Sequence, residues 1–217
     1  MEFETIWKVK RTNAKEEPAM PKLLLATANS HKVRELAEML QNTDWEVLSL
    51  ADFPDITIPP EDGATFQENA LIKALSAAEQ SGLLTLADDS GLAVDALDGA
   101  PGVHSARFAG EGHDDAANNA KLLRLLAEVP ADRRGAAFVC VIALASPDGA
   151  FLTTQGECRG EIAHAPRGQN GFGYDPLFYL PELGRTMAEL SEAEKNQISH
   201  RGRAMAKARK LLERLEK

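Results

Sequence analysis

The chain has 217 residues, with 24 lysines and arginines against 33 aspartates and glutamates for a net charge of −9, and 44% of its residues are hydrophobic. This composition is typical of a globular protein and excludes a disordered chain, a collagen-like repeat and a small disulfide scaffold. The acidic balance argues against a nucleic-acid polymer as partner, because that affinity comes largely from Lys and Arg side chains that neutralise phosphates. An anionic substrate would need local cations that reverse the overall sign.

The cysteines and the ends of the chain bear on its compartment. Cys140 and Cys158 lie in apolar or strand-like runs without Cys or His at metal-ligand spacing, so we expect buried free thiols. No stretch has the pattern of a signal peptide or a membrane span, which predicts a cytoplasmic protein that does not bind membranes. Residues 1–19 show no clear periodicity, so we expect a poorly ordered extension before a single domain at residues 20–217.

The first half of the chain alternates between short apolar runs and segments with helical spacing. Strands are predicted at residues 23–26, 45–50, 83–87 and 92–97. Helices are predicted at residues 30–40 and 64–81, with a Pro-rich acidic loop before the second and Gly82 at its end. A third helix starts at Asp114-Asp115, and its expected core face is Leu122, Leu123, Leu125, Leu126 and Val129.

The second half of the chain opens with a predicted hairpin. Apolar runs at residues 136–145 and 150–154 flank Ser146-Pro147-Asp148-Gly149, which has good turn chemistry. A Gly-rich loop, a short strand at residues 177–180 and a capping box at Ser191 follow, before a closing helix. Strand and helix units followed by a hairpin predict an α/β fold with a mixed sheet flanked by helices.

The turn after the first predicted strand is a candidate phosphate site. It contains Thr27, Ala28, Asn29, Ser30, His31 and Lys32. Free backbone N–H groups and the positive end of the following helix favour a phosphate at such a position. The alternative is that Asn29 or Ser30 only caps the helix and Lys32 is a solvated surface residue.

A pair of carboxylates, Asp88 and Asp89, lies at the end of the third predicted strand and is followed by Ser90 and Gly91. Hard cations such as Mg²⁺ take oxygen ligands and accept substrate phosphates in their remaining positions. Glu61 could supply a further oxygen. The alternative is a polar hairpin turn, for which Asp, Ser and Gly are the expected residues.

Two further segments could take part in a site. Asn69 and Lys73 share one face of the second predicted helix. The alternative is that Glu68 and Lys73 form only a solvated surface pair, and this interpretation is preferred unless independent evidence places Lys73 in a cleft. The loop with Phe172, Gly173, Tyr174 and Asp175 combines a flexible backbone with two aromatic rings, which suits either stacking on a base or plugging the core. Lys195, His200 and Arg201 come together near the start of the closing helix.

Taken together, these segments resemble the inosine triphosphate pyrophosphatase family, in the family's order from about residue 22 to the C-terminus. The segments that carry the resemblance are residues 27–32, 63–70 with Lys73, 87–92, 99–102 with Ser105-Ala106-Arg107, 171–176, and 194–195 with 198–201. Ala28 stands where the family usually has Gly, and Gln169-Asn170 replaces a small Thr-Gly pair. The ordered set is far more specific than any single segment.

The resemblance implies an elongated mixed sheet, two lobes with a central substrate groove, and a homodimer. It also implies Mg²⁺-dependent hydrolysis of ITP, dITP and XTP to the monophosphate and pyrophosphate, which cleanses the nucleotide pool. Asp89 would be the general base and, with Glu61, a metal ligand, and Lys73 would assist catalysis. The implied substrate-binding residues are Thr27, Ala28, Asn29, Ser30, His31, Lys32, Ser90, Phe172, Gly173, Tyr174, Asp175, Lys195, His200 and Arg201.

Two residues that can only donate hydrogen bonds predict which base is preferred. Lys195 and Arg201 can only donate, so they suit the 6-oxo group of inosine or xanthine and oppose the 6-amino group of adenine. Two alternatives stay open. A Maf-type pyrophosphatase would cleave dTTP or UTP in preference to ITP, and a non-catalytic nucleotide-binding regulator would bind ITP without releasing pyrophosphate.

Overall fold

The computed structural model describes residues 20–41 and 43–215, so the predicted extension at residues 1–19 lies outside the described residues. A seven-stranded sheet in the order β2-β1-β3-β4-β5-β6-β7 forms its centre. The strands are β1 (Lys22–Leu25), β2 (Glu46–Ser49), β3 (Leu84–Val94), β4 (Gly135–Ala145), β5 (Phe151–Ile162), β6 (Phe178–Leu180) and β7 (Arg185–Thr186). β1 runs parallel to β2 and β3, and the later pairs are antiparallel, which confirms the mixed sheet.

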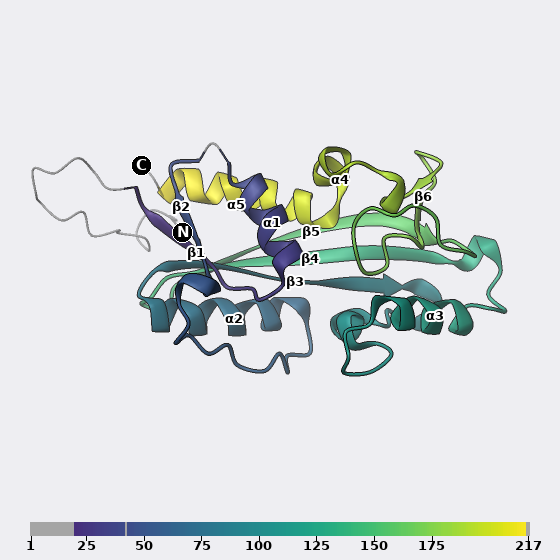
Figure 1. The fold of residues 1–217 in the computed structure, drawn as a ribbon, viewed down its shortest axis with the longest axis horizontal. Helices are drawn as coiled ribbons and strands as arrows, with labels where there is room; N and C mark the ends of the chain where they lie inside the picture. The colour runs from purple at the N-terminus through teal and green to yellow at the C-terminus, as the bar shows by residue number, and fades with distance from the viewer. Residues whose placement is uncertain (1–19, 42, 216–217) are drawn as a thin grey trace, which may run out of the picture.

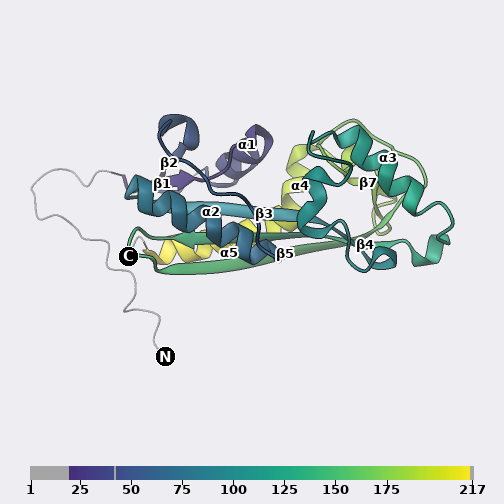
Figure 2. The same cartoon turned by 90° about the horizontal axis from the view of Figure 1, so that it is seen from below.

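Across the described residues, five α-helices flank this sheet in an elongated arrangement (Figure 1). They are α1 (Ser30–Met39), α2 (Phe66–Ser81), α3 (Asp115–Leu125), α4 (Glu192–Ile198) and α5 (His200–Leu215). α2 and α5 cover opposite faces of the long strands near one end, while α3 and α4 lie toward the other end (Figures 1 and 2). This arrangement gives the two lobes that the family resemblance implies. Over the described ranges, no helix is long and apolar enough to cross a membrane.

Alternation along the strands divides the core between the two faces of the sheet. Leu23 and Leu25 of β1 face α1 and α5, whereas Leu24 faces α2. α2 presents Ala70, Ala74, Ala77 and Ala78 to the sheet, and these small side chains let the helix backbone come close to the strands. Cys140 and Cys158 are buried free thiols, as predicted.

The helix ends follow the local signals in the sequence. Thr65 and Ser191 begin α2 and α4 with complete capping boxes, Asp114 caps α3, and Gly82 ends α2 in the left-handed conformation. These ends were predictable because each depends on contacts between residues a few positions apart.

The prediction of a break at residues 88–91 is wrong. β3 is one continuous strand, and it stays paired with β4 through Asp88↔Ile142 and Gly91↔Val139. The two carboxylates are tolerated inside a strand because each has cationic or amide partners from helices on its own side of the sheet.

Two smaller expectations also need correction. β5 extends to Ile162, well beyond the predicted end of its run, and pairs with β4 along its whole length. Leu125 is 46% exposed and does not belong to the core face of α3. That face is formed by Asn118, Leu122 and Leu126 at four-residue spacing, and Leu125 lies beside it.

Candidate active site

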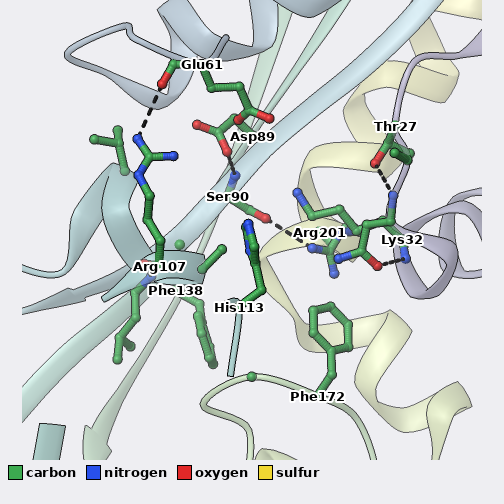
Figure 3. Close-up of a pocket in the computed structure, with 18 of the residues that line it drawn as sticks. Thr27, Lys32, Glu61, Asp89, Ser90, Arg107, His113, Phe138, Phe172 and Arg201 are labelled. Atoms are coloured by element: carbon green, nitrogen blue, oxygen red, sulfur yellow. Dashed lines mark hydrogen bonds between the residues drawn. The ribbon is translucent and has the colours of Figure 1, made fainter. Parts of the chain in front are cut away.

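A cleft of about 860 Å³ opens where β1 ends and β3 continues. β1 pairs with β3 only over Leu84 to Leu86, so β3 has no β1 neighbour beyond that point. The turn that follows β1 lies beside this open edge, and residues from both faces of the sheet reach it (Figure 3). Binding sites in α/β proteins commonly lie at such carboxyl ends of parallel strands.

The cleft brings together most of the residues predicted for the site. Those that line it are Thr27, Ala28, Asn29, Lys32, Glu61, Lys73, Asp89, Ser90, Phe172, Gly173, Tyr174, Asp175, Lys195, His200 and Arg201. The side chains of Ser30 and His31 lie outside what the structure describes, so their predicted roles stay predictions.

The turn at residues 27–32 is shaped by its own side chains. The Thr27 hydroxyl accepts a hydrogen bond from the Asn29 backbone N–H at 3.2 Å, and the Asn29 side chain accepts one from the Lys32 N–H at 3.3 Å. Asn29 therefore caps α1, as the simpler alternative had it, yet the same turn lines the cleft. The other part of that alternative is wrong, because Lys32 is not a solvated surface residue: its side chain pairs with buried Asp88 at 2.9 Å. A capped helix start still presents its first N–H groups and its positive dipole end, so phosphate binding at this turn stays a prediction.

The adjacent aspartates of β3 point to opposite faces of the sheet. Asp88 is fully buried and pairs with Lys32 at 2.9 Å and Arg201 at 3.6 Å. Burial alone would raise the pKa of Asp88, but the charges of Lys32, Arg201 and Lys73 hold that pKa far below its usual value. Asp88 does not line the cleft, so its carboxylate holds cations that do.

Asp89 has the opposite electrostatic character. Its carboxylate accepts hydrogen bonds from the Asn69 amide at 3.0 Å and from the Ser90 backbone N–H at 2.8 Å. Burial raises the pKa of Asp89. The positive charges of Lys73 and Lys32 oppose that shift, but the nearby negative charge of Glu61 adds to it, so the net pKa of Asp89 is raised. A carboxylate whose pKa is raised at the mouth of a cleft is a suitable proton acceptor.

Glu61 and Lys73 complete this side of the cleft. Their side chains form an ion pair at 3.1 Å, and Lys73 is almost completely buried. The interpretation of Lys73 as a solvated surface residue is therefore wrong. Asn69 lies one helical turn before Lys73, and its amide oxygen accepts the Gly63 N–H at 2.8 Å, which ties the loop before α2 to Asp89.

The donor set here suits a hard divalent cation. Glu61 and Asp89 offer carboxylate oxygens close together in the cleft (Figure 3). Mg²⁺ is commonly held by one or two carboxylates together with substrate phosphates and water. Within residues 20–41 and 43–215, no group of three or more His, Cys, Asp and Glu side chains could hold a metal ion.

The opposite end of the cleft is built on a buried carboxylate that the sequence analysis missed. Glu35 of α1 accepts hydrogen bonds from Lys195 at 3.0 Å and from Arg201. Burial opposes its ionisation, yet the two cations keep the pKa of Glu35 below its usual value. The available signal was its position beside Leu36 on the buried side of a predicted amphipathic helix, but nothing local identifies its partners, 160 or more residues away.

Phe172 lies below these two cations. The Lys195 ammonium and the Arg201 guanidinium stand 4.8 Å and 5.6 Å from its ring centroid. Tyr174 is buried instead, and its hydroxyl donates to the Ser105 carbonyl at 2.8 Å. Tyr174 is therefore packed into the core, whereas Phe172 lines the cleft, where its stacking on a base stays a prediction.

His200 adds an imidazole ring to the lining of the cleft. Burial lowers the pKa of His200 well below its usual value, and the charges of Arg201 and Lys195 lower it further. Its imidazole stacks on Phe138 with 4.8 Å between ring centroids. His200 therefore stays uncharged at neutral pH.

Arg107 is a cleft residue to which the sequence analysis gave no role. Its guanidinium reaches the Glu61 backbone carbonyl at 3.4 Å from the short helical segment Gly102–Arg107 (Figure 3). Over the part of the chain that the structure describes, no carboxylate lies within 4.0 Å of it. The other lining lysines and arginine are all ion-paired, namely Lys32, Lys73, Lys195 and Arg201. Arg107 is thus the cation least compensated by protein carboxylates.

Comparisons with known proteins identify the family. Residues 23–211 match the Ham1 family. The chain is 59% identical to the dITP/XTP pyrophosphatase of Desulforamulus reducens, covering 89% of this chain and 96% of that protein. The corresponding protein of Geobacter sulfurreducens is 57% identical, covering 86% and 94%.

Solved structures agree with these sequence relatives. A HAM1 protein structure from Coxiella burnetii superimposes with a TM-score of 0.84 at 46% identity, covering 90% of this chain and 100% of that one. The Ham1 protein of Staphylococcus aureus gives a TM-score of 0.80 at 42% identity, covering 88% and 98%. With the cleft, the elongated mixed sheet and these matches in agreement, the chain belongs to the Ham1 family.

Proposed function

We propose that this chain hydrolyses nucleoside triphosphates between the α- and β-phosphates and prefers ITP, dITP and XTP. The observation that carries the proposal is the division of one cleft into two ends. One end holds Asp89, Glu61 and Lys73, and the other holds Phe172 beneath Lys195 and Arg201. The names of the D. reducens and G. sulfurreducens relatives support the same substrates.

Asp89 is the proposed proton acceptor for an attacking water. Its two hydrogen bonds, from Asn69 and Ser90, fix the orientation of the carboxylate and leave lone pairs for a water molecule. The water oxygen bonds to the α-phosphorus, its proton passes to Asp89, and the bond to the bridging oxygen breaks with its electrons going to pyrophosphate. Positioning and electrostatics carry most of such a reaction.

Glu61 and Asp89 are the proposed ligands of Mg²⁺. When bound there, the ion would neutralise charge on the polyphosphate. Lys32, Lys73 and Arg107 line the same region and would receive the phosphate oxygens. Of the three, Arg107 is the most available to bind a phosphate, because it does not have to break an ion pair with a protein carboxylate first.

The base would stack on Phe172 and meet hydrogen-bond donors at its edge. Lys195 has three N–H donors, and two of them are directed to Glu35 and Asp175, which leaves one for the substrate. A 6-oxo group can accept from such donors, whereas a 6-amino group leaves them unpaired in a buried site. Such a mismatch can discriminate by about 10⁴-fold or more.

Two further parts of the proposal concern the state of the protein. The family resemblance supports a homodimer, and the two buried free thiols support a reducing, cytoplasmic location. Light scattering on the purified chain would measure its mass in solution, and a mass equal to the 23.5 kDa chain would contradict the homodimer.

Pyrophosphate release from a panel of ITP, XTP, dITP, GTP, ATP and dTTP, with and without Mg²⁺, tests the proposed function. We expect rapid release from the first three and only with the metal. Comparable turnover of ATP would overturn the donor argument at the base edge. Preference for dTTP would indicate a Maf-type enzyme, and ITP binding without release would indicate a regulator.

A further inference from the structure

α3 holds the loop that carries Phe172, although it lies in the lobe away from β1 and β2 (Figure 2). The Asp115 carboxylate accepts a hydrogen bond from the Gly173 N–H at 2.7 Å. The Asn119 amide donates to the Gly173 carbonyl at 2.9 Å. Asp115 and Asn119 are four residues apart and share one face of the helix, so one helical turn satisfies both backbone groups of a single glycine.

This loop needs such restraint. Gly171 and Gly173, on either side of Phe172, have φ values of 75° and 62°, in the left-handed region that favours glycine. Glycines also give the unrestrained chain the most backbone freedom. Without external contacts the ring of Phe172 would sample many positions, and a ligand would have to order it at a cost in affinity.

The other side of the loop is already anchored in the base end of the cleft. The Phe172 N–H donates to Asp175 at 3.0 Å, and the same Asp175 oxygen accepts from Lys195 at 2.8 Å. The ring is therefore held between two supports. Asp175 and Lys195 belong to the proposed base site. α3 contributes Asp115 to the lining of the cleft, but it supplies neither the phosphate turn nor the donors at the base edge.

We propose that Asp115 and Asn119 are positioning residues for base recognition, which set Phe172 in the cleft before the nucleotide arrives. The inference rests on the proposed function, because it assigns these residues to the stacking part of that site. It places their effect on affinity for the base and not on the phosphates or on the chemical step.

The variant Asn119→Ala tests this directly. We expect KM for ITP to rise about fivefold to tenfold, the scale of losing one hydrogen bond that orders a binding group, while kcat changes little. Inorganic triphosphate, which has no base, should inhibit the variant as strongly as it inhibits the original chain. An unchanged KM, or an equal loss of affinity for both compounds, would overturn the proposal.

A matched control comes from the neighbouring residue. Asn118 is buried on the same turn and holds Ala106 and Ala109 through two hydrogen bonds, without touching Gly173. Asn118→Ala should lower the thermal midpoint at least as much as Asn119→Ala, but it should leave the ratio of ITP to triphosphate affinity unchanged. The same shift of that ratio in both variants would indicate general destabilisation and refute the positioning role.

Asp115 provides the conservative variant. Asp115→Asn keeps an oxygen that accepts the Gly173 N–H and should bind inosine monophosphate nearly as well as the original chain, whereas Asp115→Ala should bind it less well. Calorimetry measures this binding without turnover. If the original chain binds the monophosphate but releases no pyrophosphate from ITP, the proposed function fails while the positioning role can still be judged.

Discussion

Two neighbouring aspartates of β3 point to opposite faces of the sheet and have opposite electrostatic surroundings. On the face covered by α1 and α5, Asp88 is sealed from solvent and held ionised by Lys32 and Arg201. On the face covered by α2, Asp89 keeps 6% of its surface exposed, accepts two neutral hydrogen bonds, and has a raised pKa. One backbone position separates a carboxylate that assembles the fold from one that suits proton transfer.

The difference shows that a charged side chain in this site either neutralises a buried charge of the protein or is left for the substrate. Asp88 ties α1 and α5 to the sheet, since its two cations come from the starts of those helices. Glu35 of α1 likewise forms buried ion pairs with two cations, Lys195 of α4 and Arg201 of α5. Substitutions at Asp88 and Asp89 should therefore separate stability from activity.

The largest expected effect is on stability in Asp88→Asn. Removing one partner of a buried ion pair commonly costs about 3 to 5 kcal/mol, and we expect a value near the lower limit because Arg201 keeps Glu35. Chemical denaturation of the variant and the original chain measures the change. A loss as small as that of an ordinary surface substitution would show that Asp88 does not hold the helices.

Asp89→Asn should show the reverse pattern. Turnover should fall at least about a hundredfold, the scale of losing a positioned proton acceptor. Stability should hold or rise, because the raised pKa of Asp89 means that its ionised form opposes folding at neutral pH. Single-turnover kinetics and thermal midpoints check the two parts separately. Normal turnover in this variant would remove Asp89 from its proposed role.

Arg107→Ala should lower kcat/KM about tenfold, as expected when one charge-assisted hydrogen bond to an anion is lost. The loss should be shared by ITP and XTP, since the residue lies at the phosphate end of the cleft. Arg124, which is exposed on α3 outside the cleft, provides the control, and Arg124→Ala should behave as the original chain does. A loss that depends on the base would contradict the assignment of Arg107 to the phosphates.

The smallest expected effect is the change with pH in the stability that Asp88→Asn removes. The lowered pKa of Asp88 means that its stabilisation is complete above the unfolded pKa near 3.8 and is lost as the pH falls toward the folded pKa. The penalty of Asp88→Asn should therefore shrink by about 1 kcal/mol between pH 7 and pH 3. Denaturation curves at both values measure it, and a penalty that grows on acidification would contradict the sign.

The family, the mixed sheet and most residues of the cleft were predictable from the sequence. The helix start at Ser191 was predictable for a physical reason, because a cap is decided by groups three residues apart. The hairpin of β4 and β5 followed from its turn and the apolar runs on either side of it. The N-cap role of Asn29 was one of two open alternatives and is confirmed, and the structure also places Asn29 in the cleft.

Other features depended on the tertiary structure alone. The sequence could not show whether Lys73 lies in a cleft, or whether Asp88 and Asp89 interrupt a strand. It also gave no sign that Glu35 has ion-pair partners. Each of these depends on a charge or an amide brought from a distant part of the chain, such as Lys195 to Glu35 and Asn69 to Asp89. Sequence by itself therefore determined the local elements and the residue types of the site, whereas burial and ion pairing, which set protonation and exposure, were decided only when the helices met across the sheet.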